Sequence, residues 1–148
     1  MAVTVSFKII AISGNRCAGK DTLFNALKST DGGSDRFKRY AFADALKCDL
    51  KELITEQFGI DLFNATGEEK EFVRPILISY GCIWRERDVD HWCKKVCTAI
   101  KTDVDTSSPT IVPVITDLRF KNELDVLRKE YGSNLYHIHL ERKNNVEP

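Results

Sequence analysis

The sequence predicts a three-layer α/β fold, in which a parallel sheet is flanked by helices. One observation is an apolar stretch, residues 3–12, that leads into a glycine-rich segment ending in Gly19-Lys20 and then into a helical pattern. The other is that helical patterns alternate with two further apolar stretches of strand length, Thr110–Ile115 and Leu135–Leu140. Alternating strands and helices are typical of parallel sheets, and the order strand, glycine-rich loop, lysine, helix is typical of P-loop NTPases.

The expected strands differ in how they are buried. Val3–Ile12 begins with alternation and becomes wholly apolar, as expected of a strand that is covered on both faces. Thr110–Ile115 is strongly apolar, and Pro113 within it predicts an irregularity, because proline offers no N–H to a neighbouring strand. Leu135–Leu140 alternates, and the short run Tyr40–Phe42 is expected to form one more strand.

Helices are expected wherever apolar residues recur at helical spacing. These patterns cover residues 23–27, 44–58, 68–84, 90–101 and 120–131. Pro75 lies inside the third pattern, and that helix is therefore expected to begin near Pro75 rather than to pass through it. Gly59 and Gly132 are expected to end two of the helices, and turns or irregular loops are expected at 31–35, 61–66 and 106–109.

Composition narrows the class of protein. The chain has 148 residues and 43% hydrophobic residues, which predicts one domain (1–148) with a sizeable core. Its 22 basic and 22 acidic residues balance, so broad electrostatic binding to nucleic acid or membranes is not expected. Five cysteines without a C-x-x-C pair fit reduced thiols in the cytoplasm. No apolar run of membrane-spanning length and no signal peptide are apparent.

The glycine-rich segment predicts a phosphate-binding loop. Two glycines let successive backbone N–H groups point inward, and the helix that follows adds the positive end of its dipole. Lys20 can then reach the outer phosphates of a nucleotide. The alternative is an ordinary turn between a strand and a helix. The candidate loop comprises Gly14, Asn15, Arg16, Cys17, Ala18, Gly19, Lys20, Asp21 and Thr22.

The residue after the lysine departs from the usual loop pattern. Most such loops place Ser or Thr there to bind Mg²⁺, whereas this chain has Asp21 followed by Thr22. A carboxylate at this position can hold magnesium directly or through water. Alternatively, Asp21 is only an acid in the first turn of a helix, where the helix dipole stabilises it.

Further candidates follow the expected strands. Asp117 ends the second apolar strand, where an acid can hold magnesium or orient an attacking hydroxyl, or can cap the next helix. Arg119 and Glu123 can reach the same cleft, or can lie on a solvated face. Asp44 and Lys47 begin a helix, and a helix start with a lysine one turn in can bind a second, smaller phosphate.

The remaining candidates are arginine, cysteine and histidine side chains. Three arginines, Arg74, Arg85 and Arg87, bracket an expected helix. Arginines suit phosphoryl transfer because they bind phosphate through two hydrogen bonds. Each of them taken singly, however, is more often a surface residue. His91, Cys93 and Cys97 lie on one expected helix and are expected to be core or boundary residues rather than metal ligands. His137 and His139 face the same side of an expected strand, and no carboxylate or cysteine pattern supports them as metal ligands.

Several of these segments occur in an order that resembles a known family. They are the Gly14–Thr22 loop with its GKDT ending, Phe42–Lys47, Arg74–Gly81, Trp84-Arg85 with Trp92, and Thr116–Glu123. Together they resemble the deoxynucleoside monophosphate kinases of phages and large DNA viruses, within the nucleoside monophosphate kinase group. The resemblance covers about residues 7 to 142 of the sequence.

The resemblance implies transfer of the γ-phosphate of ATP to a deoxynucleoside monophosphate, with Mg²⁺ as cofactor. It implies that Lys20 and the loop hold ATP, that Asp21, Thr22 and Asp117 surround magnesium, and that Arg119 lies near the transferred group. It further implies that residues of a helical region, about 40–102, bind the monophosphate, and that Arg142 begins a lid over ATP. The implied acceptor-side residues are Phe42, Asp44, Lys47, Arg74, Arg85 and Glu123.

Alternative functions remain open on the sequence alone. The sequence ends at Pro148, so the lid and C-terminal elements of such kinases are expected to be absent. A shortened kinase can act as a nucleotide-binding module through a partner, and an exposed sheet edge can favour a homodimer. A kinase of another small phosphorylated acceptor, of the dephospho-coenzyme A or phosphomevalonate type, also fits the phosphate loop.

Overall fold

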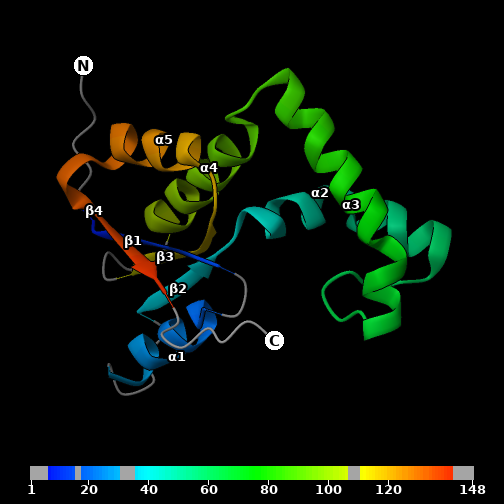
Figure 1. Ribbon diagram of the computed structural model, residues 1–148, viewed down its shortest axis with the longest axis horizontal. Helices are drawn as coiled ribbons and strands as arrows, with labels where there is room; N and C mark the ends of the chain where they lie inside the picture. Colours follow the sequence, from blue (N-terminus) through cyan, green and yellow to red (C-terminus); the bar gives the residue numbers. More distant parts are fainter. Residues whose placement is uncertain (1–6, 16–17, 31–35, 107–110, 142–148) are drawn as a thin grey trace.

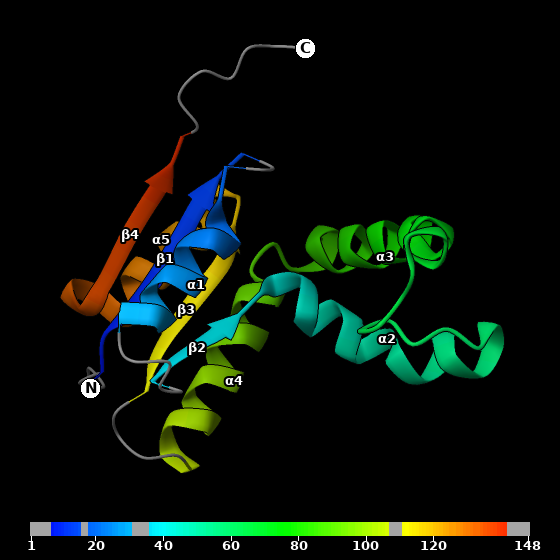
Figure 2. The ribbon, with the colours of Figure 1, turned by 90° about the horizontal axis from the view of Figure 1, so that it is seen from below.

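A parallel sheet forms the centre of the molecule. The computed structural model describes residues 7–15, 18–30, 36–106 and 111–141. Within these residues the sheet has four strands in the order β2-β3-β1-β4, and each neighbouring pair is parallel. The strands are β1 (Ile9–Gly14), β2 (Phe37–Tyr40), β3 (Val112–Leu118) and β4 (Leu135–Leu140). The predicted α/β fold is confirmed, and all carboxyl ends of the strands point to one edge (Figure 2).

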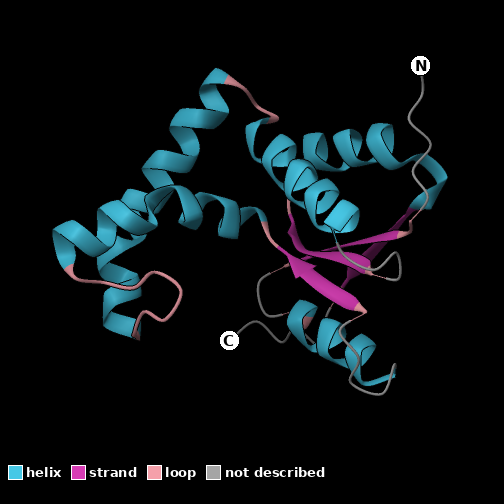
Figure 3. Ribbon diagram, turned by 180° about the vertical axis from the view of Figure 1, so that it is seen from behind, coloured by secondary structure: helices cyan, strands magenta, loops and turns pink. Residues whose placement is uncertain are grey.

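Helices cover both faces of the sheet (Figures 1 and 3). Helix α1 (Lys20–Thr30) packs on one face, where Phe24 meets Ile12 and Val114 in a small buried cluster. Helices α4 (His91–Thr106) and α5 (Lys121–Tyr131) pack on the other face. The larger core lies there, and its members include Ile9, Ala11, Val96, Ile100, Ile115 and Leu127. Burial of these aliphatic side chains on both faces provides the main driving force for the three-layer arrangement.

Two further helices extend away from the sheet (Figure 2). They are α2 (Phe42–Phe58) and α3 (Gly67–Arg87), and they pack against each other through a second core made of Leu50, Ile54, Ile60, Leu62 and Val73. Helix α2 ends at Gly59, which adopts the left-handed conformation predicted for a helix stop (φ 66°). The bases of α2 and α3 flank the carboxyl edge of the sheet.

Helix α3 corrects one prediction. It begins at Gly67 and passes through Pro75, so the expected start near Pro75 was wrong. A reciprocal capping pair sets the true start: the Glu69 N–H donates to Thr66 Oγ1 at 3.2 Å, and the Thr66 N–H donates to Glu69 Oε1 at 2.9 Å. Val73 is buried against α2 before the proline, so tertiary packing and the cap outweigh the hydrogen bond that proline cannot make.

The second strand also differs from prediction. Strand β2 covers Phe37–Tyr40, and Phe42 is the first residue of α2 rather than the last residue of a strand. The physical reason is that the carboxylate of Asp117, near the end of β3, caps the start of α2. Thr106, expected in a loop, is the last residue of α4. The predicted turn at 31–35, the rest of the predicted loop at 107–109 and the first part of the first strand lie outside the described residues.

Pro113 is accommodated inside the sheet. It lies in β3, between β2 and β1, and is paired in register with Lys38 of β2. Pairing of β3 with β1 begins only at Val114, which lies opposite Ile10. Pro113 therefore lies before the first paired residues of β3 and β1, and its missing N–H removes no hydrogen bond between these two strands. The irregularity predicted at Pro113 is therefore not found there; the β1–β3 register shifts further along, between Ala11 and Ser13.

Candidate active site

The phosphate-loop candidate turns sharply at the end of β1. Gly14 has a φ of 151°, and a Cβ at this position would lie 2.6 Å from the carbonyl oxygen of Leu140 on β4. Only glycine fits there. Gly19 has a φ of 101°, and the Ala18 N–H donates to the Asn15 carbonyl at 3.0 Å. Both glycines therefore adopt backbone conformations that residues with a side chain rarely adopt. Its residues Arg16 and Cys17 lie outside the described residues.

Lys20 lies at the mouth of this loop. It is the first residue of α1, and its Nζ donates to the Gly14 carbonyl oxygen at 3.0 Å. The ammonium group is therefore folded over the carboxyl end of β1, where the helix dipole of α1 is also directed. Asp21 and Thr22 follow in the first turn of α1, and both are exposed to solvent. An anion at the loop would meet one full charge, the loop amides and the dipole together.

A cleft of about 950 Å³ opens beside the loop. It brings together residues that are distant in the sequence, because the carboxyl ends of parallel strands share one edge of the sheet. Besides Gly14 and Asn15 of the loop, the candidates Lys20, Asp21, Asp117 and Arg119 line it. Arg74 of α3 also reaches its wall, although its guanidinium is exposed and lies 3.6 Å from a carboxylate oxygen of Glu71.

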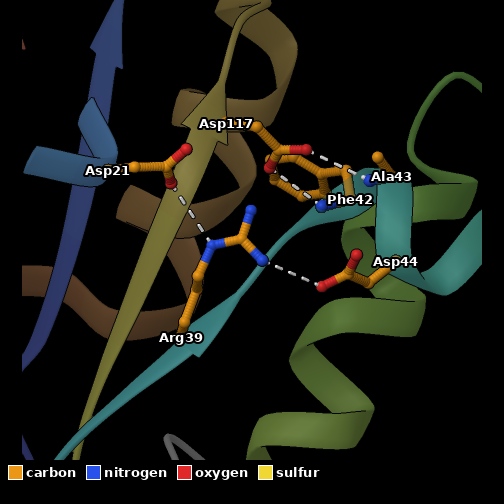
Figure 4. A network of polar contacts seen from close by, with 6 residues as sticks. All are labelled: Asp21, Arg39, Phe42, Ala43, Asp44 and Asp117. Carbon is orange, nitrogen blue, oxygen red and sulfur yellow. Dashed lines mark hydrogen bonds and ion pairs between the residues drawn. The ribbon is translucent and has the colours of Figure 1, made fainter. Parts of the chain in front are cut away.

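Asp117 has a structural partner that the sequence could not reveal. Its Oδ1 accepts the Phe42 N–H at 2.9 Å, and its Oδ2 accepts the Ala43 N–H at 3.1 Å (Figure 4). Helix α2 has no side-chain cap of its own at Ala41. Asp117 therefore caps α2, not the helix that follows it in the chain. Burial raises the pKa of the Asp117 carboxyl, and these two N–H groups and the nearby Arg39 oppose that shift.

Glu123 caps the helix that follows Asp117. Its Oε1 accepts the Arg119 N–H at 2.9 Å and the Phe120 N–H at 2.7 Å at the start of α5. The side chain is buried, and burial raises the pKa of its carboxyl against the effect of both hydrogen bonds. The carboxylate thereby holds the Arg119–Phe120 backbone in place at the edge of the cleft.

A second, smaller groove lies between α2, α3 and the segment before α5. It has a volume of about 350 Å³ and an apolar floor that includes Phe42, Leu46, Leu77, Gly81 and Trp92. Its rim carries Lys47 and Arg85, two acceptor-side candidates from the sequence. The Arg85 guanidinium lies 3.6 Å from the centre of the Phe120 ring, and the Arg119 guanidinium lies 5.4 Å from that centre. Stacking on an aromatic face orients a guanidinium.

The cleft and the groove meet at one short segment. Asp117, Arg119 and Phe120 line both. Ligands bound in the two hollows would thus approach each other beside the Arg119 guanidinium. This is the arrangement required for transfer of a charged group between two bound molecules.

Sequence reasoning missed two groups of residues at or next to the cleft. Arg39, on β2, lies between Asp21 and Asp44, and a basic residue directly before a short predicted strand was the available signal. In the cleft itself, Ser13 Oγ hydrogen-bonds His137 Nε2 at 2.8 Å and His139 Nδ1 at 2.9 Å. Both histidines line the cleft, although the sequence suggested no role for them. Arg142, the expected start of a lid, lies outside the described residues.

A family comparison agrees with this architecture. The sequence model described as phosphomevalonate kinase matches residues 12–133, which run from the end of β1 through the candidate phosphate loop to the end of α5 and include most residues that line the two hollows. The chain belongs to the phosphomevalonate kinase family. A search of curated proteins returned no match. The predicted kinase class is confirmed at this level, and the match supports the phosphomevalonate-type alternative rather than the resemblance to deoxynucleoside monophosphate kinases.

Membership of the phosphomevalonate kinase family implies phosphoryl transfer from ATP. In the described residues no three His, Cys, Asp or Glu side chains gather as a metal site. No helix in that part of the chain is long and apolar enough to cross a membrane. The predicted core role of Cys93 agrees with its burial, which raises the pKa of its thiol to about 12.

Proposed function

We propose that this member of the phosphomevalonate kinase family transfers the γ-phosphoryl group of ATP to a small acid that already carries a phosphate, of the phosphomevalonate type. The observation that carries the proposal is the meeting of the phosphate-loop cleft with the acceptor groove at Asp117, Arg119 and Phe120. The family match supports the reaction class and the type of acceptor.

In this proposal ATP binds at the phosphate loop. The loop amides and Lys20 hold its phosphates, because together they present converging N–H donors and a point charge. Asp21, Thr22 and Asp117 offer the oxygen atoms that Mg²⁺ prefers. Magnesium in kinases is usually held by one or two carboxylates, water and the nucleotide phosphates, so a cluster of three protein carboxylates is not needed. The ion, when bound, would neutralise charge on the phosphates.

The acceptor occupies the groove between α2 and α3. Arg85 is held against the Phe120 ring and presents a fixed pair of donors to a phosphate or carboxylate. Lys47, on the first turns of α2, and Arg74, at the wall of the cleft, add further positive charge. An acceptor with two anionic groups therefore finds cations on more than one side.

The transfer itself needs positioning and charge stabilisation. An oxygen of the acceptor phosphate attacks the γ-phosphorus, the bond from that phosphorus to the β–γ bridging oxygen breaks, and ADP leaves. The attacking phosphate is already anionic at neutral pH, so no general base has to remove a proton. Lys20 and Arg119 stabilise the charge that develops on the transferred group. Asp117 contributes by fixing α2 relative to β3.

A nucleoside monophosphate is the second candidate acceptor, because one observation favours it. The groove floor is apolar and aromatic, with Phe42 and Trp92 among its side chains. A flat base would bury well against such a surface, whereas a branched hydroxy acid has little apolar area to offer.

The test is an assay of ADP formation with ATP and Mg²⁺ and a panel of acceptors: mevalonate 5-phosphate, dephospho-coenzyme A, and each ribo- and deoxyribonucleoside monophosphate. Lys20→Met is the site variant, and Lys28→Met, at the other end of α1, is its matched control. Turnover with mevalonate 5-phosphate that falls about 100-fold or more in Lys20→Met alone supports the proposal.

Other outcomes of this assay separate the alternatives. Turnover with a nucleoside monophosphate, and none with the phosphorylated acid, would show that the acceptor is a nucleoside monophosphate. Binding of ATP without ADP formation on any acceptor would overturn the kinase proposal and favour a nucleotide-binding module.

A further inference from the structure

A single guanidinium group bridges the two halves of the site. Arg39 Nε lies 3.5 Å from Asp21 Oδ1, and Arg39 Nη1 lies 3.3 Å from Asp44 Oδ2 (Figure 4). Asp21 belongs to the first turn of α1 and directly follows Lys20 of the phosphate loop. Asp44 belongs to the first turn of α2, which borders the acceptor groove. Arg39 thus contacts the donor side and the acceptor side at once.

The bridge is surrounded by negative charge. Asp117 lies beside it and caps the same end of α2, so three carboxylates lie around one guanidinium (Figure 4). Without the positive charge of Arg39, these carboxylates would repel one another and any phosphate bound nearby. The planar guanidinium can contact two carboxylates in fixed directions, which the ammonium of lysine does less well.

Folding stability does not account for this bridge. The side chains of Arg39, Asp21 and Asp44 are 42%, 77% and 38% exposed, and exposed ion pairs contribute little to stability. The adjacent residue on β2 gives a direct comparison. Lys38 pairs with Asp103 of α4 at 2.8 Å, away from both hollows. The strand therefore carries two adjacent basic side chains of similar exposure, 49% for Lys38 and 42% for Arg39, of which only Arg39 joins the start of α1 to the start of α2.

We propose that Arg39 is a positioning residue that sets the spacing between the donor and acceptor halves of the site. By holding Asp21 and Asp44 on one guanidinium, it keeps the start of α1 and the start of α2 at one separation. Phosphoryl transfer requires the reacting atoms to lie about 3–3.5 Å apart and in line, so a small change in that separation lowers the rate more than it lowers binding. The inference rests on the proposed kinase function.

The test compares Arg39→Met, which keeps the length of the side chain but removes its charge, with Lys38→Met as the matched control on the same strand. Steady-state kinetics are measured with ATP and acceptor varied in turn, and binding of a non-hydrolysable ATP analogue is titrated directly. We expect kcat to fall about 10- to 100-fold in Arg39→Met, with each KM and the analogue Kd within about threefold of wild type. Lys38→Met should leave all of these unchanged.

Further variants keep the test decisive if Arg39→Met folds poorly. Arg39→Lys retains the charge without the planar fork and should recover part of kcat. Asp44→Asn weakens one arm of the bridge and should lower kcat, and combining it with Arg39→Lys should cost less than the product of the two single effects. Thermal melting of each variant shows whether the fold is retained.

Three results would overturn the inference. In the first, Arg39→Met behaves as Lys38→Met does. In the second, its loss lies only in one KM, which would indicate contact with a single ligand. In the third, wild-type protein binds the ATP analogue but transfers no phosphoryl group to any acceptor, which removes the proposed function and this inference with it. The first two leave the kinase function standing.

Discussion

The carboxylate of Asp117, near the end of β3, accepts the backbone N–H of Phe42 at 2.9 Å and so caps a helix that began 75 residues earlier in the chain. Its second oxygen accepts the Ala43 N–H at 3.1 Å. This pair of hydrogen bonds fastens α2, which borders the smaller groove, to the strand whose end lines the larger cleft. The Asp117 side chain is thus one of the contacts that place the two hollows relative to each other.

Replacement of Asp117 should destabilise the protein through this cap. Asp117→Ala leaves the Phe42 and Ala43 N–H groups without their acceptor and should lower the free energy of unfolding by about 1–2 kcal/mol. Asp117→Asn keeps one acceptor oxygen and should lose less. Urea denaturation measures both, with Asp125→Ala on the exposed side of α5 as control. An unchanged free energy of unfolding in Asp117→Ala would contradict a capping role.

Gly14 should tolerate no side chain. In Gly14→Ala the new Cβ would meet the Leu140 carbonyl oxygen at 2.6 Å at a φ of 151°, so the loop or β4 has to move. We expect a loss of about 1–3 kcal/mol in unfolding free energy and weaker binding of ATP. Gly67→Ala is the control, because a Cβ there has no neighbour within 4 Å. Thermal melting and nucleotide titration test this, and equal behaviour of the two variants would refute it.

Gly81 should affect the acceptor groove selectively. A Cβ at Gly81 would lie 2.8 Å from Leu46 Cδ1, and both residues line the groove. The end of the leucine side chain can rotate, so Gly81→Ala should fold while it narrows the groove. The expected result is a raised KM for the acceptor and an unchanged KM for ATP, relative to Ser79→Ala on the exposed side of α3. A change confined to the ATP KM would place the acceptor elsewhere.

The buried carboxyl of Glu123 should make stability depend on pH. Burial raises its pKa above the ordinary value of 4.5, so the folded protein holds this proton more tightly than the unfolded chain does. Its contribution to stability is therefore present below pH 4.5 and is lost as the pH rises through the folded-state pKa. Glu123→Gln keeps an oxygen for the Arg119 and Phe120 N–H groups but cannot ionise.

Urea denaturation of wild type and Glu123→Gln between pH 4 and 7 measures this effect. The free energy of unfolding of wild type minus that of the variant should decrease as the pH rises through this range. The charge of Asp117 also raises the pKa of Glu123, so the difference reports Glu123 together with its interaction with Asp117. A difference that stays constant with pH would mean that burial does not perturb Glu123.

Much of the fold could be predicted because its signals are local. The apolar runs of β1 and β4 and the helical spacing of α2, α4 and α5 are properties of neighbouring residues, and the structure confirms them. The glycines at 14 and 19 reflect local backbone demands in the same way. The errors at Pro75 and Phe42 arose where a distant contact, packing on α2 or the cap from Asp117, overrode the local preference.

The sequence alone therefore determined the α/β class and the kinase class and located the candidate phosphate loop, because periodicity and loop chemistry are properties of adjacent residues. Tertiary structure decided which of these parts contact one another. Only folding brought Asp117 to the start of α2, set Arg39 between Asp21 and Asp44, and joined the cleft and the groove at Phe120. Such contacts depend on strand order and helix placement, which single-sequence patterns do not encode.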